Sequence, residues 1–363
     1  MSTIHDLPTP AVLIDLDALE RNIARMADAA RANGVALRPH AKTHKTIEIA
    51  RLQIAAGAVG LTVAKTSEAE VYADSGFADV FVAYPVVGAD KGRRLLALAD
   101  RLRMAVGVDS VEGAATLAGV FAGAGRTLDV RLKVDVGLHR VGVPPADAAR
   151  LAQRITDLPG LRLRGIFTHG GHAYGSEDEA GVVAVARDEG QTMAEVAATL
   201  RALGLELDTV SVGSTPTARG AMVVAGVTEC RPGNYVFHDF SQLSLGTCGL
   251  EDCALTVLAT VVSVPEAGRA VVDAGSKTLS SDPLHPRVGG HGLVLGTGSR
   301  LARLSEEHGV IVVEPGDHFQ VGDRIRILPN HACVVSNLHD RLTTVRGEEV
   351  VGAFAVAARG RVE

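Results

Sequence analysis

The residues best suited to chemistry lie in Pro39–Lys45, which reads Pro-His-Ala-Lys-Thr-His-Lys. This segment follows the apolar run Val35–Leu37, so we expect it at the end of a strand. Alternation along the strand predicts that Arg38, His40 and Lys42 share one face. Neighbouring cations favour the neutral form of a lysine, and a neutral amine forms a Schiff base with a carbonyl such as that of pyridoxal phosphate (PLP). The alternative is a solvated basic loop with ordinary surface lysines.

Two turns offer backbone N–H groups for a phosphate: Gly213-Ser214-Thr215, which precedes an expected helix, and Gly233-Asn234. Backbone N–H groups at helix starts and in tight turns bind anions. The chain has no Walker loop, which disfavours nucleotide hydrolysis. Ser and Thr also cap many helices that bind nothing, so this alternative stays open.

A third candidate site is the segment Pro329–Cys333. His331 and Cys333 are two residues apart and would face the same way in an extended segment. Thiolate and imidazole suit zinc, and two protein ligands leave positions for water and substrate, as catalytic sites require. The alternative is a buried structural cysteine beside a hydrogen-bonded histidine.

Eight short β-type runs alternate with amphipathic helical segments over the first two thirds of the chain. Eight βα units predict a parallel (β/α)₈ barrel of the TIM type, an α/β fold. The expected strands are Val35–Lys42, Ala58–Lys65, Asp79–Pro85, Met104–Ser110, Asp129–Gly137, Leu161–Gly170, Asp208–Ser214 and Val227–Tyr235. The clearest helices are Leu16–Gly34, Asp90–Leu102, Pro144–Leu158 and Asp178–Leu203.

A second, mostly antiparallel β domain is expected after the barrel. Valine-rich runs and Pro/Gly turns begin there, so we assign residues 12–240 to the barrel and 241–363 to the β domain, to which residues 1–11 could add a strand. The expected strands are Ala254–Val264, Ala270–Asp273, Gly309–Val313, Asp323–Ile327 and Ala332–Val335.

Composition limits the function classes. The 363 residues are 47% hydrophobic and 3% aromatic with a net charge of −6, which disfavours a nucleic-acid partner. Four cysteines without zinc-finger spacing favour a reducing compartment. The first ten residues show no signal peptide, and no apolar run approaches the roughly 18 residues of a membrane span. We therefore expect a cytoplasmic protein with no membrane partner.

Five motifs occur in order along the chain: Pro-His-x-Lys-Thr at 39–43, Gly-x-His-Arg-x-Gly at 137–142, Gly-Ser-Thr-Pro-Thr at 213–217, Arg-Pro-Gly-Asn-Tyr at 231–235 and Pro-Asn-His-x-Cys at 329–333. Together they resemble the D-serine dehydratase and D-threonine aldolase family, the metal-dependent branch of fold-type III PLP enzymes. Barrel relatives of this family include alanine racemase. The resemblance covers nearly the whole chain.

The resemblance implies that Lys42 is the Schiff-base lysine and that His169 lies near the PLP ring as the second catalytic residue. It places Arg140 near the phenolate oxygen and Tyr174 near the pyridine nitrogen. The remaining implied cofactor residues are His40, Ser214, Thr215, Gly233, Asn234 and Tyr235, and the implied ligands of Zn²⁺, or else Mn²⁺ or Mg²⁺, are His331 and Cys333.

The same resemblance implies a lyase for D-3-hydroxy amino acids. The His-x-Cys pair and the Gly-Ser-Thr-Pro loop resemble the dehydratase side, so we expect elimination of water from D-serine or D-threo-3-hydroxyaspartate. The runner-up is D-threonine aldolase-type cleavage to glycine and an aldehyde. A metal-free PLP racemase, with Tyr84 or a partner subunit supplying the second acid/base, and a PLP carrier remain alternatives.

A homodimer is expected because barrel relatives commonly complete their sites across a dimer. Asp282, Arg287 and His291 are candidates for the pocket or the dimer interface, or else ordinary loop residues.

Overall fold

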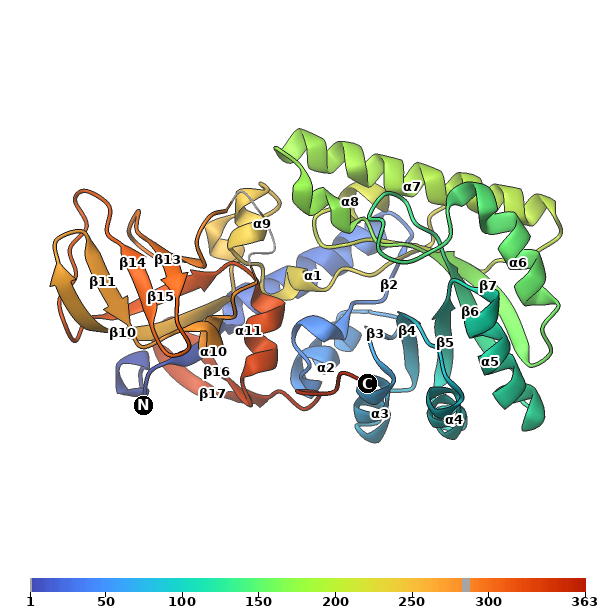
Figure 1. Cartoon of the computed structure of the whole chain (residues 1–363), viewed down its shortest axis with the longest axis horizontal. Helices are drawn as coiled ribbons and strands as arrows, with labels where there is room; N and C mark the ends of the chain where they lie inside the picture. The colour runs from blue at the N-terminus through green and yellow to red at the C-terminus, as the bar shows by residue number, and fades with distance from the viewer. Residues whose placement is uncertain (1, 283–287) are drawn as a thin grey trace. The chain divides into compact units, whose positions relative to one another are not determined.

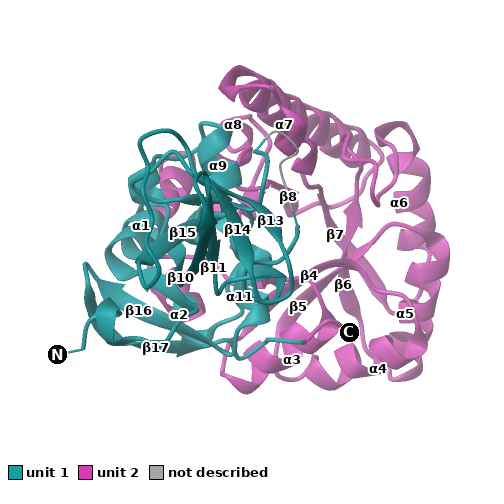
Figure 2. Cartoon of the chain, turned by 60° about the vertical axis from the view of Figure 1, so that its left-hand side comes forward, with its two compact units in different colours: residues 1–25, 43–49, 234–360 teal, residues 26–42, 50–233, 361–363 magenta. Residues whose placement is uncertain are grey.

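The computed structural model describes residues 2–282 and 288–363, so Arg287 lies outside the described residues. The chain divides into two compact units (Figure 2). Unit 1 is drawn from Met1–Arg25, Thr43–Ile49 and Asn234–Gly360, and unit 2 from Met26–Lys42, Ala50–Gly233 and Arg361–Glu363.

The chain passes from unit 2 into unit 1 between Gly233 and Asn234. The domain boundary expected after residue 240 lies a few residues beyond this point. Unit 1 also contains residues 12–25 and 43–49, which the sequence assigned to the barrel.

Unit 2 is an eight-stranded parallel sheet in the order β2-β9-β8-β7-β6-β5-β4-β3. A parallel bridge between His40 and Thr62 joins its two ends, so the sheet closes into the expected (β/α)₈ barrel. Its strands are β2 (Ala36–Leu37), β3 (Leu61–Val63), β4 (Asp79–Pro85), β5 (Arg103–Val108), β6 (Leu128–Lys133), β7 (Leu161–Phe167), β8 (Thr209–Val212) and β9 (Glu229–Cys230).

The barrel strands read as apolar runs because both of their faces are covered. Val80, Phe81 and Val82 of β4, for example, are all fully buried. Helices pack around the outside of the strands (Figure 1). They are α1 (Leu16–Ala32), α2 (Ile47–Ala55), α3 (Thr66–Asp74), α4 (Ala89–Leu98), α5 (Val111–Gly123), α6 (Ala148–Thr156), α7 (Glu179–Ala202) and α8 (Ala218–Ala221).

Side-chain caps fix where two of these helices begin. The hydroxyl of Ser110 accepts from the Gly113 N–H at the start of α5, and the carboxylate of Asp178 accepts from the Gly181 N–H at the start of α7. Such caps satisfy N–H groups that have no partner within the helix. None of the described helices combines the length and apolar composition needed to span a bilayer.

Unit 1 is a nine-stranded, mostly antiparallel sheet in the order β11-β14-β13-β12-β15-β10-β1-β16-β17. An additional pairing of β10 with β11 closes six of the strands into a second barrel. The strands are β1 (Ala11–Asp15), β10 (Leu255–Glu266), β11 (Arg269–Val272), β12 (Gly292–Val294), β13 (Arg300–Leu304), β14 (Gly309–Val312), β15 (Arg324–Pro329), β16 (Arg341–Arg346) and β17 (Glu349–Ala355).

The N-terminal segment before the first helix adds a strand to the β domain, as the sequence suggested: β1 pairs with β10 and β16. Two differences from the sequence prediction concern unit 1. Four strands, β12, β13, β16 and β17, were not predicted. The predicted strand Ala332–Val335 is wrong, because these residues begin helix α11 (Ala332–Leu338). The other described helices of unit 1 are α9 (Phe240–Ser244) and α10 (Ser276–Leu279).

Candidate active site

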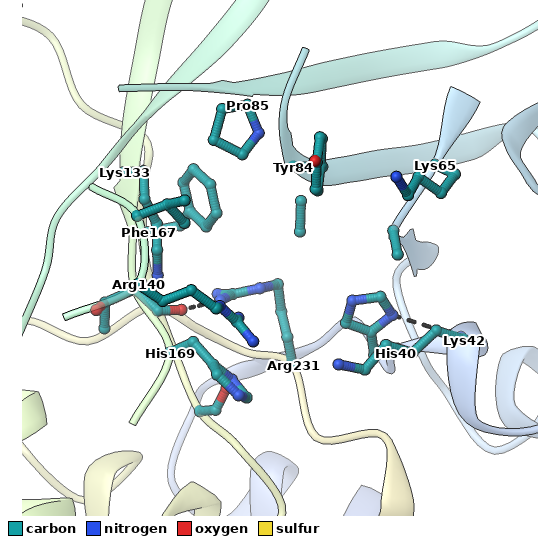
Figure 3. A pocket seen from close by; sticks show the side chains of 15 residues that line it. His40, Lys42, Lys65, Tyr84, Pro85, Lys133, Arg140, Phe167, His169 and Arg231 are labelled. Atoms are coloured by element: carbon teal, nitrogen blue, oxygen red, sulfur yellow. Dashed lines mark hydrogen bonds between the residues drawn. The ribbon is translucent and has the colours of Figure 1, made fainter. Parts of the chain in front are cut away.

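A cavity of about 360 Å³ lies at the carboxyl ends of the unit 2 strands (Figure 3). This is the end at which barrel enzymes place their chemistry. Its lining is His40, Lys42, Ala64, Lys65, Ala83, Tyr84, Pro85, Lys133, Arg140, Val141, Phe167, Thr168, His169, Gly213 and Arg231. Among the described residues, the lining therefore contains seven basic or imidazole side chains and no carboxylate.

Lys42 and His40 enter the cavity from the segment that follows β2. Lys42 lies in a short 3₁₀ helix, Ala41–Thr43, and its backbone N–H donates to Nδ1 of His40 over 3.4 Å. Because Nδ1 accepts this bond, a neutral His40 carries its ring proton on Nε2. The short helix thus sets the tautomer of one cavity residue while it holds the other.

Arg38 does not share a face with His40 and Lys42, contrary to the prediction from strand alternation. Strand β2 ends at Leu37, so the alternation stops before the functional residues. Arg38 is 5% exposed, and its Nε donates to Oε2 of Glu229 over 2.7 Å. Its guanidinium also donates to Asp79. Arg38 therefore belongs to a buried ion network inside the barrel.

His169 follows β7, and its Nδ1 lies 3.2 Å from the carbonyl oxygen of Gly213. A carbonyl only accepts, so Nδ1 carries the ring proton and Nε2 is left as an acceptor. Burial lowers the pKa of His169 well below its usual value, and the positive charges of Lys42 and Arg140 lower it further. His169 is therefore a neutral imidazole at neutral pH, able to take a proton at Nε2.

Arg140 lies in a loop after β6 that is shaped by the Gly-x-His-Arg-x-Gly motif. The carboxylate of Asp135 accepts from the N–H groups of Gly137 and His139, each over 3.1 Å. Gly142 has φ +116°, and a Cβ there would lie 2.9 Å from the Asp135 nitrogen, so only glycine fits. These contacts fold the loop that brings Arg140 to the cavity.

The cavity is also lined by three basic residues that were not among the predicted site residues: Lys65, Lys133 and Arg231. Arg231 is 4% exposed and donates to Ser211 and to the carbonyl of Thr168. Its Nε is buried and has no hydrogen-bond partner among the described residues.

Lys133 ends strand β6, with its amine 5.0 Å from the ring centroid of Phe167. Burial lowers the pKa of Lys133 well below its usual value, and the charge of Arg231 adds to this effect. The predicted strand Asp129–Gly137 extended past Lys133. A strand predicted to end at Lys133 would have identified this residue as a candidate for the site.

The turn expected to hold a phosphate follows β8. The Ser214 N–H donates to Oγ1 of Thr217 over 3.1 Å, and the following helix α8 has only four residues. Gly213 lines the cavity, whereas the neighbouring residues of the turn do not. The expected cofactor residues of unit 2 outside the cavity lining are Tyr174, Ser214, Thr215 and Gly233.

Glu189 of α7 positions two loops of the site and was not predicted. Its fully buried Oε1 accepts from the N–H of Gly170 over 3.0 Å and from the N–H of Gly213 over 2.8 Å. One carboxylate thereby ties the loop after β7, which carries His169, to the turn after β8. A single acidic residue in an amphipathic helix gives no sequence signal of this role.

Asn234 and Tyr235 belong to unit 1, in the 3₁₀ helix Asn234–Val236. The Asn234 side-chain amide donates to Oδ2 of Asp239 over 2.6 Å, and the Ala332 N–H donates to the same oxygen over 3.0 Å. Burial raises the pKa of Asp239, although these donors act in the opposite direction. Asp239 thus joins the Asn234 turn to the start of α11.

His331 and Cys333 lie at the start of α11, not in the extended segment predicted. His331 caps the helix with an extended backbone (φ −140°, ψ 99°), and this turn still brings its side chain into hydrogen-bond contact with that of Cys333. His331 Nδ1 lies 2.9 Å from Oδ2 of Asp282, and the Cys333 thiol donates to Thr43 over 3.2 Å.

His331 and Cys333 carry imidazole and thiol groups, and both groups can be metal donors. His331 Nδ1 is engaged by Asp282, which leaves Nε2 for a metal. Burial lowers the pKa of His331, but the negative charge of Cys333 and the contact with Asp282 raise it to about 10, so a metal ion at Nε2 would have to displace a proton. Within residues 2–282 and 288–363, no group of three or more His, Cys, Asp or Glu side chains is arranged to hold a metal ion.

Comparison with known proteins agrees with this fold. The model of the alanine racemase N-terminal domain matches residues 14–239, and that of a putative serine dehydratase domain matches residues 254–345. The chain therefore belongs to the D-serine dehydratase and D-threonine aldolase family of fold-type III PLP enzymes.

Individual relatives carry two activities. The D-threo-3-hydroxyaspartate dehydratase of Delftia sp. (strain HT23) is 38% identical over 91% of this chain and 92% of that protein. The crystal structure of a D-threonine aldolase from Filomicrobium marinum has a TM-score of 0.91 and 38% identity, and the match covers 99% of this chain and 98% of that one.

Two further solved structures are mutants of a D-threo-3-hydroxyaspartate dehydratase, each 36% identical to this chain with a TM-score of 0.90. The matches cover 98% of this chain and 96% and 99% of theirs. One has a histidine replaced by alanine. The other has a cysteine two positions later replaced by alanine and is described as the metal-free form.

Proposed function

We propose that the protein is a PLP- and divalent-metal-dependent dehydratase that removes water from a D-3-hydroxy amino acid to give a keto acid and ammonia. The observation that carries this proposal is the cavity of unit 2, where Lys42 and the neutral His169 lie in a lining without a carboxylate. D-Serine and D-threo-3-hydroxyaspartate are the proposed substrates. The 38% identity to a dehydratase for the latter supports this choice.

PLP fits the chemistry of the cavity residues. Lys42 supplies an amine for the aldehyde, Arg140 a cation for the phenolate, and the unpartnered Nε–H of Arg231 a donor for a further acceptor. When bound, PLP withdraws electrons from the substrate Cα and weakens the bonds there. We assign the phosphate and the other cofactor contacts to His40, Tyr174, Ser214, Thr215, Gly233, Asn234 and Tyr235.

Elimination requires a base at the substrate Cα. We assign this role to the Lys42 amine, which takes the Cα proton while the electron pair of that bond forms a double bond and the Cβ–oxygen bond breaks. The hydroxyl leaves as hydroxide and takes up one proton to become water. The released enamine tautomerises to an imine by gaining a proton at Cβ and losing one from nitrogen, and hydrolysis of this imine yields the keto acid and ammonia. His169, with Nε2 free to accept, is the second proton carrier.

A divalent cation, zinc in the first place and Mn²⁺ or Mg²⁺ as alternatives, is assigned to His331 and Cys333. Imidazole and thiolate are zinc donors, and only two protein ligands leave room for the substrate hydroxyl. The cation would stabilise the departing hydroxide. The spacing of the mutated histidine and cysteine in the related dehydratase, and the metal-free state of its cysteine mutant, support this assignment.

Aldolase activity is the second candidate, because an aldolase structure matches this chain at 38% identity and a TM-score of 0.91. It would use the same cofactor and metal but break the Cα–Cβ bond. A metal-free racemase or a PLP carrier would leave the His331–Cys333 pair without a role. We further propose a cytoplasmic homodimer with a small-molecule substrate and no nucleic-acid or membrane partner.

The products decide between these functions. Protein reconstituted with PLP and zinc is incubated with D-serine, D-threonine and D-threo-3-hydroxyaspartate, with Lys42→Ala as the inactive control. Keto acid and ammonia in equal amounts are expected for at least one substrate. Glycine with an aldehyde would replace the proposal by the aldolase, and racemised substrate by the racemase.

A further inference from the structure

Lys65 and Tyr84 form a pair on one wall of the cavity. Lys65 follows β3 and caps helix α3, and Tyr84 lies at the end of the neighbouring strand β4. The Lys65 amine is 4.4 Å from the centroid of the Tyr84 ring. Figure 3 shows both side chains directed into the cavity, on the same side as Lys42.

No carboxylate balances the charge of Lys65. Its amine makes no ion pair within the described part of the chain, and no lining residue of the cavity is acidic. The ring face of Tyr84 offsets only part of the cost of holding an ammonium group there. A cation kept in place among other cations is the arrangement expected where an anion binds.

The other cations of the cavity have different surroundings. Arg231 is occupied by the Thr168 carbonyl and Ser211, and the Lys133 amine is packed against Phe167. Arg140 follows β6, and two strands, β4 and β5, separate β6 from β3. Lys65 therefore lies on a different part of the cavity wall from Arg140. It lies beside the segment that carries Lys42, because His40 forms a parallel β-bridge with Thr62 of β3.

We propose that Lys65, held by the ring of Tyr84, is the subsite for a carboxylate of the substrate. This inference rests on the proposed function, because it takes the substrate to be an amino acid bound in this cavity. Two carboxylates have the required chemistry: the α-carboxylate shared by all the candidate substrates and the side-chain carboxylate of 3-hydroxyaspartate. Tyr84 acts as a positioning residue through the amine of Lys65.

Kinetics of Lys65→Met on D-serine and D-threo-3-hydroxyaspartate test the subsite and separate the two carboxylates. A charged hydrogen bond lost from a carboxylate predicts a KM increase of about 10- to 100-fold with a smaller change in kcat. An equal increase for both substrates identifies the α-carboxylate. An increase confined to hydroxyaspartate identifies the side-chain carboxylate. Lys65→Arg should recover part of the loss because it keeps the charge.

Variants of a lysine outside the cavity and of Tyr84 test whether the effect is specific to the Lys65 subsite. Lys91→Met, on α4 and outside the cavity lining, should leave KM unchanged. Tyr84→Leu should raise KM in the same direction as Lys65→Met, and Tyr84→Phe should raise it less because it keeps the ring. An unchanged KM for both substrates in Lys65→Met overturns the proposal. A loss of PLP affinity without a KM change overturns it as well.

Calorimetric titration with succinate, a dicarboxylate without a reactive group, keeps this test independent of turnover. Wild-type PLP-loaded protein should bind succinate, and Lys65→Met should bind it about tenfold or more weakly. If succinate binding depends on Lys65 but the protein turns over neither substrate, the subsite is supported and the proposed reaction is rejected. Equal binding by both proteins would reject the subsite.

Discussion

His331 Nδ1 and the carboxylate of Asp282 lie 2.9 Å apart. Partners of this kind orient a metal-binding histidine, and their loss typically lowers metal affinity or activity 10- to 100-fold. Asp282→Ala should therefore weaken zinc binding by about this factor, as measured by competition with a chromogenic chelator. Asp188→Asn, an exposed position on α7, is the control. Wild-type affinity in Asp282→Ala would contradict the assigned role of His331.

Metal removal should separate the two cofactors. Dialysis against a chelator is expected to abolish turnover while the visible absorption of bound PLP remains, because none of the residues assigned to PLP is a proposed metal ligand. Added zinc should restore activity in wild type but not in His331→Ala or Cys333→Ala. Full activity in protein shown by elemental analysis to be metal-free would contradict the metal dependence.

Glu229 makes the stability of the barrel depend on pH. Burial raises the pKa of this carboxyl, but the guanidinium groups of Arg131 and Arg38 outweigh burial and lower the pKa to about 2 from its usual 4.5. Because the folded pKa lies below the unfolded one, this stabilisation is present above about pH 4.5 and is lost as the pH falls toward 2.

Glu229→Gln should consequently lower the free energy of unfolding by about 3–5 kcal/mol at pH 7, as for a broken buried ion pair, and by less at pH 3. Urea denaturation at several pH values measures this difference. Glu206→Gln removes an exposed partner of Arg164 and should cost no more than about 1 kcal/mol. A Glu229→Gln effect that is the same at every pH would contradict the ion-pair origin.

The barrel could be predicted because its strands are local features of the sequence. Each is a short apolar run between turn residues, and all eight appear in the structure, although most are shorter than predicted. His169, which lies shortly after the end of β7, follows from the same pattern, whereas Lys42 lies in a 3₁₀ helix beyond the end of β2. The location of a strand end was harder to predict, as Lys133 shows.

Features that depend on contacts distant in sequence could not be predicted. Arg38 pairs with Glu229 across 191 residues, so its burial follows from the barrel register and not from its neighbours. Ala332–Val335 has the β-branched composition of a strand, yet its N–H at Ala332 is held by Asp239 from another segment, and a helix begins there. Glu189 likewise acquires its role only through the loops it joins.

The proposed function depends on the attachment of PLP to one particular amine. Three lysines, Lys42, Lys65 and Lys133, line one cavity, and only Lys42 is assigned the bond to the cofactor. Protein reconstituted with PLP is reduced with borohydride, digested and analysed by mass spectrometry. The reduced cofactor is expected on the peptide that contains Lys42. Its presence on Lys65 or Lys133, or its absence from all three, would contradict the assignment of Lys42 as the Schiff-base lysine.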